Sequence, residues 1–356
     1  MSRVAGFFAP LVAVLAAFAV GALLILAAGK DPILAYTALF SGALGDMFGI
    51  QVQFGETILK MTPLLFIGLG VAFGLHCRVW NIGAEGQLYI GALAATLVAL
   101  AWEDASPWLL IPATAVAAFL AGGLWGGIPG FFKARFRVDE IISTFLLNFV
   151  GFYFVSYLAH GPMRDPVGWL PQSRMIGDNA ALPILVQGTR IHLGIALGLV
   201  CAGVMYWIFK RTTWGYELQA VGANPGAARF GGISVGRNVF LALVVSGGLA
   251  GLAGMGEVQG NMGRLQDTLS PGYGFTGIVV AILGRLNPAG IIVAAFFFAI
   301  LFVGGDAMQG AAKISNAIIE VLQGIIVLFV IGSEVLINAA LRRELLGRLR
   351  RKPAVE

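Results

Sequence analysis

Long apolar runs without a charged side chain recur along almost the whole sequence. Two of them, Met61–Leu75 and Leu88–Ala101, flank a short polar stretch, and another runs from Val4 to Ala28. An α-helix needs about 20 apolar residues to cross the hydrocarbon core of a bilayer. The chain is 58% hydrophobic and only 12% charged, with a mean hydropathy of +0.87. These values exclude an ordinary soluble domain and predict an all-α, polytopic integral membrane protein.

About ten apolar segments are expected to be membrane helices. They are Val4–Ala28, Thr57–Cys77, Glu85–Ala101, Pro107–Phe132, Glu140–His160, Ile191–Phe209, Asn238–Val258, Gly274–Gly284, Ala289–Gly305 and Asn316–Ala340. The segment Gly274–Gly284 is too short to cross comfortably, so it either begins earlier, near Leu269, or is a partial helix packed inside the bundle. Between the first two spans, Ile33–Gln53 has a mixed composition, which predicts an interfacial segment or a loop outside the membrane. Residues 1–340 would then form one transmembrane domain, followed by a basic cytoplasmic tail at 341–356.

Basic residues are distributed unequally between the two ends of these spans. With a cytoplasmic N-terminus, 16 of the 23 Lys and Arg residues fall on the inner side and 7 on the outer side. Cytoplasmic loops of membrane proteins carry an excess of Lys and Arg. The distribution therefore predicts that both termini are cytoplasmic. It also explains the net charge of +5 without nucleic acid as a partner.

Small residues are spaced for close packing of helices. The sequence holds 50 glycines. Pairs four residues apart occur within presumed helices at Gly70/Gly74, Gly122/Gly126, Gly123/Gly127, Gly194/Gly198 and Gly247/Gly251. Such pairs lie on one helix face and let neighbouring helices approach closely. By contrast, the two cysteines lie in apolar runs and the three histidines are scattered, so we expect neither a disulfide framework nor a metal site.

A polar stretch between two spans is the first candidate for a functional site. Its sequence is Arg78-Val79-Trp80-Asn81-Ile82-Gly83-Ala84-Glu85-Gly86-Gln87. Ionisable groups at membrane depth cost about 2.5–3.5 kcal/mol each and usually face a protein interior or a wet cavity. One interpretation is a short polar turn at the inner surface. The other is part of a polar path that folds back into the bundle, and the grouping of Asn81, Glu85 and Gln87 favours it.

Two later spans add polar residues to the candidate path. Asn148 lies within the expected span Glu140–His160, and Glu320 shares a helical stripe with Asn316 and Gln323. For each of these residues the alternative is an interhelical hydrogen bond that only holds the bundle together.

The loop Lys210–Asn238 on the inner side is the second candidate site. Asn224 can cap a short helix with Pro225 at its first position, and Gly231-Gly232 can end that helix. We expect a helix of about two turns, pinned between two spans and facing the cytoplasm. Such a helix could serve as a contact surface for another protein, and the alternative is a solvated connector.

Two motifs in these stretches resemble those of a known family. The sequences NIGAEGQ at Asn81–Gln87 and GANPGAARFGGISVGR at Gly222–Arg237 resemble the permeases of bacterial ATP-binding-cassette (ABC) importers for simple sugars and nucleosides, the branched-chain amino acid/ribose-type permease family. The resemblance runs from about Thr57 to Ile331. Arg78 followed by Trp80-Asn81-Ile82-Gly83 is closer to the nucleoside-type branch, because the aspartate-containing Gly-rich motif of the ribose-type branch is absent.

The resemblance implies a multi-pass permease of the bacterial inner membrane. In this family an extracytoplasmic binding protein delivers the solute, two permease subunits form the path, and cytoplasmic ATPase subunits drive alternating access. The length of this chain resembles the larger permease of a heterodimer. The inner loop looks like the coupling loop that docks into the ATPase. The residues implied in that contact are Gly222, Asn224, Pro225, Ala228, Arg229 and Gly232.

The chain itself is then a transport subunit and not an enzyme. It lacks a GxxxxGK[ST] phosphate-binding loop, since its one Gly-Lys pair, Gly29-Lys30, is followed by Asp31. ATP and Mg are therefore expected on the partner ATPase, with no cofactor on this chain. A nucleoside is neutral and rich in hydroxyl groups, so the amides and carboxylates of the path could hydrate it transiently without binding it tightly.

Two other functions stay open from the sequence. The same machinery could import a simple sugar such as ribose or galactose. The chain could instead be an ion-coupled secondary transporter, with Glu85 and Glu320 as proton or sodium sites. The structured inner loop and the absence of a visible internal repeat favour the ABC importer.

Overall fold

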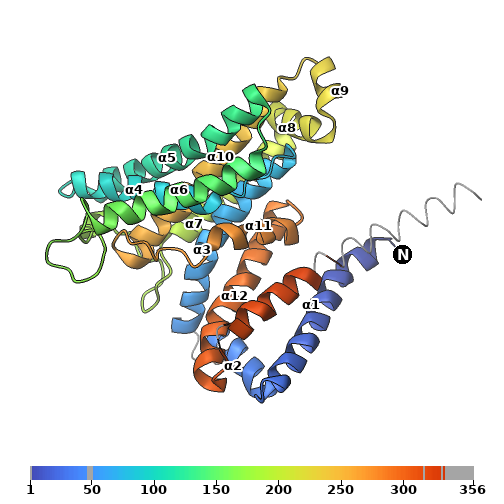
Figure 1. Cartoon of the computed structure of the whole chain (residues 1–356), viewed down its shortest axis with the longest axis vertical. Helices are drawn as coiled ribbons and strands as arrows, with labels where there is room; N and C mark the ends of the chain where they lie inside the picture. The colour runs from blue at the N-terminus through green and yellow to red at the C-terminus, as the bar shows by residue number, and fades with distance from the viewer. Residues whose placement is uncertain (1, 46–50, 316, 330–331, 333–356) are drawn as a thin grey trace, which may run out of the picture. The chain divides into compact units, whose positions relative to one another are not determined.

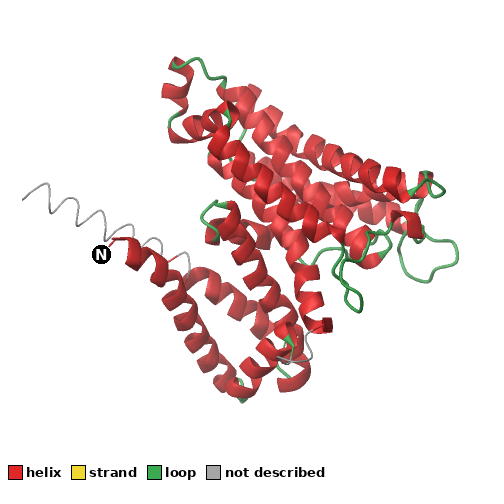
Figure 2. Ribbon diagram, turned by 180° about the vertical axis from the view of Figure 1, so that it is seen from behind, coloured by secondary structure: helices red, strands yellow, loops and turns green. Residues whose placement is uncertain are grey.

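The computed structural model describes residues 2–45, 51–315, 317–329 and 332. Within these residues the regular secondary structure is helical, with isolated β-bridges in the loops and no strand (Figure 2). The prediction of an all-α chain is confirmed. The chain divides into a larger unit, residues 47–299, and a smaller unit drawn from residues 1–46 and 300–356.

The larger unit contains most of the helices (Figure 1). They are α3 (Gln51–His76), α4 (Ala84–Ala101), α5 (Pro107–Phe136), α6 (Glu140–His160), α7 (Leu193–Arg211), α8 (Thr213–Ala223), α9 (Pro225–Phe230), α10 (Val235–Glu257), α11 (Tyr273–Leu283) and the first part of α12 (Pro288–Ala312). A single 3₁₀ turn, η1 (Asp178–Ala180), lies in the loop before α7, and a π-helical turn, η2 (Val258–Met262), extends α10.

Seven of the described helices are long and apolar enough to cross a membrane. They are Val52–His76, Ala84–Ala101, Pro107–Phe136, Glu140–His160, Leu193–Arg211, Val235–Met262 and Pro288–Ala312, and each coincides with a predicted span. Shorter apolar helices occur at Val12–Ala27, Pro32–Leu44, Tyr273–Leu283 and Ala317–Phe329. The chain is thus a polytopic membrane protein, while the count of ten spans and the side of the termini stay predictions. Most of the last predicted span and the tail 341–356 lie outside the described residues.

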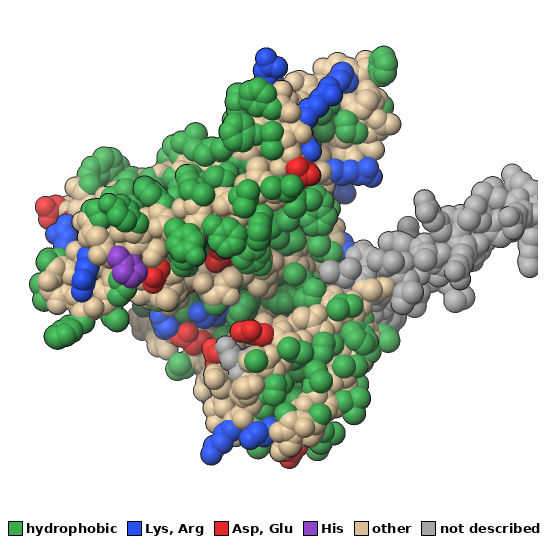
Figure 3. All heavy atoms as spheres, viewed as in Figure 1, with side chains coloured by type: hydrophobic (Ala, Val, Ile, Leu, Met, Phe, Trp, Pro, Cys, Tyr) green, Lys and Arg blue, Asp and Glu red, His purple; other side chains and the backbone are tan. Residues whose placement is uncertain are grey.

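The spans of the larger unit form an inner and an outer set. In the most apolar windows of α3 and α10, 83% and 78% of the residues are buried, against 22% in α6. The central helix α10 packs against α5, α4 and α3. Apolar side chains cover the outward faces of α5 and α6 (Figure 3), among them Leu124 and Phe149. Such a surface suits contact with lipid.

Glycine rows allow α10 to lie against its neighbours. Gly247 and Gly251 face Gly122 and Gly126 of α5, and a Cβ built on Gly251 would collide with the carbonyl of Ala118. The predicted GxxxG pairs on α5 and α10 are therefore packing contacts, as expected for helices that approach closely in a membrane.

Replacing Gly251 with leucine is expected to disrupt this packing. A larger side chain would meet backbone that cannot move aside, so the cost should lie at or above the upper end of the roughly 1–3 kcal/mol typical of overpacked cores. Gly203→Leu is the matched control, because a Cβ at Gly203 on α7 meets nothing within 4 Å. Thermal unfolding of the purified chain measures both variants. Equal melting temperatures would contradict the packing assigned to Gly251.

The smaller unit is also helical. It contains α1 (Ser2–Ala27), α2 (Pro32–Leu44), the rest of α12 and the helix Ala317–Phe329. The Asp31 carboxylate accepts hydrogen bonds from the N–H groups of Ile33 and Leu34, at 2.8 and 3.4 Å, and Pro32 occupies the first helical position. Of the two alternatives for Ile33–Gln53, a loop is excluded over the residues of α2, and an interfacial segment stays a prediction. An Asp at the N-cap followed by Pro at the first position favours a helix, and here it does so although the composition of the segment is mixed.

Candidate functional site

The stretch after α3 folds back into the bundle. α3 ends at His76, Arg78 adopts a left-handed conformation with a φ of 54°, and the Val79 N–H returns to the carbonyl of Gly74 at 3.1 Å. The chain then runs inward, so that Asn81 is 1% exposed. Its side chain contacts Ser246, the twelfth residue of α10, about 16 Å along that helix. Of the two predicted arrangements, the structure has the one that folds back.

Asn81 and Gln87 form a closed amide network with Ser246. The Asn81 Nδ2 donates to Gln87 Oε1 at 2.7 Å and to Ser246 Oγ at 2.8 Å. The Asn81 Oδ1 accepts from Gln87 Nε2 and from the Gly83 N–H, both at 3.0 Å. Both donor hydrogens and both acceptor sites of the Asn81 amide are therefore used. The network fixes the start of α4 against α10.

Asn148 supplies the cap that the first turn of α4 lacks. Gly83, at the N-cap position of α4, has no side chain that could accept a hydrogen bond. Asn148 on α6 accepts from the Gly86 N–H at 2.8 Å and donates to the Ile82 carbonyl at 2.7 Å. The first N–H groups of a helix have no partner within that helix, and lipid offers none. A side chain from α6 thus makes it possible for α4 to begin inside the bundle.

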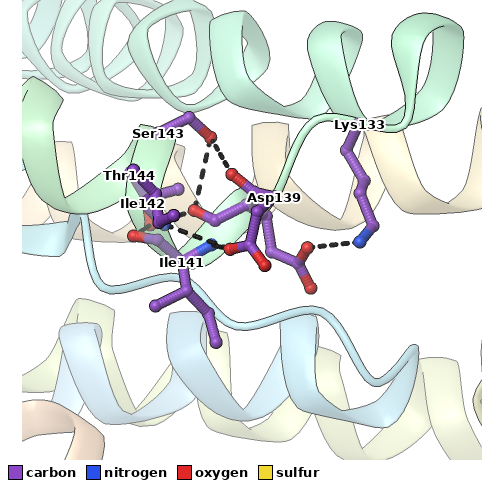
Figure 4. Close-up of polar contacts among 7 residues, drawn as sticks. Lys133, Asp139, Ile141, Ile142, Ser143 and Thr144 are labelled. Atoms are coloured by element: carbon purple, nitrogen blue, oxygen red, sulfur yellow. Dashed lines mark hydrogen bonds and ion pairs between the residues drawn. The ribbon is translucent and has the colours of Figure 1, made fainter.

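The start of α6 is itself fixed locally (Figure 4). Asp139 accepts from the N–H groups of Ile141 and Ile142 at 2.8 and 3.2 Å, and Lys133 pairs with Glu140 at 2.5 Å. These contacts hold Thr144, whose hydroxyl accepts from the Ile82 N–H at 3.2 Å. The loop before α4 is therefore bonded to α6 at two positions.

Glu85 caps a second helix that begins inside the bundle. Its carboxylate accepts from the Gly274 N–H of α11 at 2.6 Å, and the Ser270 side chain and the Gly272 backbone add polar contacts. A negative group at a helix N-terminus is stabilised by the helix dipole. Gly274 is required here because a Cβ would collide with the backbone of Glu85. Of the two predicted arrangements of this segment, α11 is the partial helix, starting at Tyr273.

The structure thus brings together four of the five path candidates, each bonded within the larger unit. Glu320 lies instead on Ala317–Phe329 of the smaller unit, with an exposed side chain, and Asn316 lies outside the described residues. The polar partners Ser246, Thr144 and Ser270 were not predicted from the sequence. A hydroxyl within an apolar run is a weak signal, and only the fold shows which amide it meets.

The predicted helix in the inner loop is present as α9. Asn224 Oδ1 accepts from the N–H groups of Gly226 and Ala227 at 2.9 and 3.1 Å, and Pro225 is the first helical residue. Gly231 caps the other end, and Gly232 follows with a φ of 79°. Local capping signals in the sequence are sufficient to define both ends of this helix.

The six coupling candidates divide into exposed and buried residues. Asn224, Pro225, Arg229 and Gly232 are exposed, whereas Gly222 and Ala228 are buried. Phe230, beside Arg229, is 97% exposed. A groove of about 470 Å³ runs between α8 and α9, and its lining includes Tyr216, Glu217, Ala220, Ala227 and Ile233. The exposed aromatic ring and the groove form a surface suited to another protein.

The helix α8, which was not predicted from the sequence, connects this surface to the central helices. Gly222 packs against the carbonyl of His76 at the end of α3. The Asn238 side chain at the start of α10 accepts from Trp214 Nε1 at 3.1 Å and donates to Glu217 at 3.0 Å. A force applied to α8 and α9 would therefore reach α3 and α10 directly. The available signal was Thr212, whose hydroxyl accepts from the Gly215 N–H at 3.1 Å and caps α8.

A further polar network lies at the opposite end of the larger unit. Buried Glu257 accepts from Asn261 Nδ2 at 2.8 Å, and Asn261 in turn accepts from the Arg190 guanidinium. Arg190 also pairs with Glu56 at 3.3 Å. This network joins α10, α3 and the segment before α7. Among the described residues, no group of three or more His, Cys, Asp or Glu side chains is placed to hold a metal ion.

Comparison with known families gives the arrangement a context. The family described as branched-chain amino acid transport system / permease component matches residues 53–331. The chain belongs to this permease family. The match includes the buried amide network, the internal helix starts and the coupling helix α9. The resemblance inferred from the two motifs is thereby confirmed.

Several curated relatives match most of this permease. It is 38% identical to a glucose ABC transporter permease of Haloferax volcanii, over 91% of this chain and 87% of the relative. It is 35% identical to a guanosine ABC transporter permease of Bacillus subtilis, over 99% of each chain. A nucleoside ABC transporter permease of Lactococcus lactis is 32% identical, over 90% of this chain and 89% of the relative. No solved structure matches the chain.

These findings define the protein at a coarse level. It is the permease component of an ABC transporter, a multi-pass protein of the cytoplasmic membrane, and its relatives are transport components rather than enzymes. The predictions of family and location are confirmed.

Proposed function

We propose that this permease imports a nucleoside, with guanosine as the first candidate. The guanosine permease of Bacillus subtilis aligns with 99% of this chain and 99% of its own length, and the Lactococcus lactis relative is also a nucleoside permease. Simple sugars are the second candidate, because the glucose permease of Haloferax volcanii has the higher identity, 38%. The end-to-end match with the guanosine permease is the observation that carries the proposal.

A heterodimer is proposed because relatives occur in pairs within one organism. Bacillus subtilis has a second guanosine permease that is 28% identical to this chain, against 35% for the first. Lactococcus lactis has a second nucleoside permease at 24%, against 32%. This chain would be the counterpart of the more similar member of each pair. Its partner would be a second, different permease, and an extracytoplasmic binding protein would deliver the solute to both.

ATPase subunits are proposed to act on the surface formed by α8 and α9. Phe230 and Arg229 would contact the ATPase, and Asn224 and Pro225 would hold α9 in shape. Closure of the ATPases would move α8 and, through Gly222 and Asn238, the ends of α3 and α10. ATP and Mg would bind to the ATPase. Two arrangements of these helices would open the path to one side or the other.

The buried polar residues are proposed to shape the path rather than to bind solute tightly. The side chains of Asn81, Gln87 and Asn148 form hydrogen bonds to other groups of this chain, and the Glu85 carboxylate caps α11. A translocation path must release what it accepts, which argues against a strong solute site. The basic residues around α8 and α9 support a cytoplasmic position for these two helices. The excess of Lys and Arg on the inner side of the predicted spans, 16 of 23, supports cytoplasmic termini.

Uptake of labelled guanosine into cells with and without the gene tests the proposed solute. The proposal predicts gene-dependent uptake that excess unlabelled guanosine abolishes and excess glucose leaves unchanged. Gene-dependent uptake of glucose, unaffected by nucleosides, would assign the permease to simple sugars instead.

A further inference from the structure

A small basic cavity lies where several helices of the larger unit end. It has a volume of about 190 Å³ and is walled by α3, α7, α8 and the turn between α11 and α12. Its polar lining residues are His76, Tyr206, Lys210, Gln219, Arg285 and Asn287. Lys210 and Arg285 are cationic, and no lining residue is acidic. The charge of this cavity favours an anion.

The inner wall of the cavity is held by contacts among its own residues. The His76 ring stacks on Phe209 with 3.9 Å between centroids, and its Nδ1 lies 2.8 Å from the Ala72 carbonyl. Gln219 donates to the Phe209 carbonyl at 3.2 Å. Lys210 and Arg285 are exposed residues at the rim. The cavity therefore combines an aromatic wall with two long cationic side chains.

An unusual turn brings Arg285 and the start of α12 to the cavity. Arg285 and Leu286 are consecutive non-glycine residues with φ values of 53° and 57°. The turn closes through the Leu286 N–H to Ala281 O and the Asn287 N–H to Gly284 O, both at 3.0 Å. Such conformations are uncommon, and they concentrate at functional sites. The N-terminus of α12, whose dipole also attracts anions, begins directly after this turn.

The position of the cavity relates it to the lipid. α7 is a peripheral helix, and its last turns expose Tyr206 and Trp207, at 54% and 58%. Tyrosine and tryptophan are enriched where membrane spans meet the headgroup layer. Because α3 and α7 end and α12 begins at the cavity, its opening is expected at headgroup level, beside the exposed Tyr206 and Trp207. A soluble anion would leave these exposed rings uncovered, whereas the acyl chains of a lipid would cover them.

We infer that this cavity binds the phosphate headgroup of an anionic phospholipid. Lys210 and Arg285 hold the phosphate oxygens, and the acyl chains lie along the exposed end of α7. Basic pockets between membrane helices on the cytoplasmic side are suited to such headgroups. The site is separate from α9, and lipid bound there would fix the relative positions of α3, α7 and α12.

Lipid retention by the purified full-length permease tests the inference. Native mass spectrometry would compare phosphatidylglycerol with phosphatidylcholine on the wild type and on the double variant Lys210→Gln with Arg285→Asn. Asparagine is chosen because it tolerates the left-handed conformation at Arg285. The expected result is a loss of phosphatidylglycerol affinity of about tenfold or more, because two charge-assisted contacts are removed. Binding of phosphatidylcholine should not change.

Three controls make the result decisive. Arg211 is next to Lys210 in the chain but does not line the cavity. The variant Arg211→Gln should therefore keep wild-type lipid retention. Lys210→Arg keeps the charge and should also retain lipid. Unchanged melting in phosphatidylcholine shows that the double variant is folded. Equal retention by the double variant and the wild type, an equal loss in Arg211→Gln, or displacement of lipid by millimolar inorganic phosphate would each overturn the inference.

Discussion

Replacing Glu85 with alanine is expected to abolish uptake and to destabilise the permease. The substitution leaves the Gly274 N–H at the start of α11 without its carboxylate partner, at a depth where lipid and packed side chains offer no substitute. A lost hydrogen bond to a charged group costs about 1.5–3 kcal/mol. Thermal unfolding of purified protein and uptake by cells with matched expression measure the two effects.

Glutamine at the same position separates capping from ion transport. Glu85→Gln keeps an oxygen that can accept from the Gly274 N–H but removes the charge. If Glu85 acts as a cap, this variant should retain most of the stability and uptake that the alanine variant loses. Wild-type stability combined with abolished uptake in Glu85→Gln would contradict the capping role, and would favour a proton or sodium site at Glu85.

Replacing Phe230 with aspartate is expected to disconnect the permease from its ATPase. The ring is 97% exposed, so its removal should leave folding and membrane insertion unchanged. Aromatic anchors at interfaces often contribute 2 kcal/mol or more, which corresponds to roughly 30-fold in Kd. We expect uptake to fall by about this factor or more at normal expression. Co-purification of the ATPase subunits measures the contact directly.

Conservative and distant variants control for this result. Phe230→Leu keeps an apolar side chain and should retain most of the co-purification. Trp169→Asp removes an equally exposed aromatic ring, at 97%, from the loop between α6 and α7 and should not change ATPase binding. Wild-type co-purification and uptake by Phe230→Asp would exclude Phe230 from the coupling contact.

The sequence was sufficient to predict the elements that depend on local signals, namely α9 and the membrane spans. Asn224, Pro225 and Gly231 define α9 through caps within a few residues of one another, and apolar runs define the spans through composition alone. GxxxG pairs such as Gly247/Gly251 identified helix faces in close contact. For Ile33–Gln53 the mixed composition predicted an interfacial segment or a loop, and the local signal Asp31-Pro32 accounts for the helix α2 found there.

The candidate site could be predicted only as a collection of residues. Asn81 and Ser246 are bonded although they are 165 positions apart, and Glu85 and Gly274 are 189 apart. No periodicity or spacing encodes such pairs. The sequence showed that polar groups were concentrated in apolar surroundings. It could not show that Asn148 and Glu85 act as caps for helices that begin inside the bundle, because that role exists only once α4, α6 and α11 are packed.

The energy source of uptake tests the central proposal most directly. Labelled guanosine uptake would be measured in cells that carry the gene, once after ATP depletion with the proton gradient maintained, and once with an uncoupler while ATP is held constant. An ABC importer predicts that uptake stops without ATP and continues with the uncoupler. Uptake that stops with the uncoupler while ATP remains would contradict the account and identify an ion-coupled transporter.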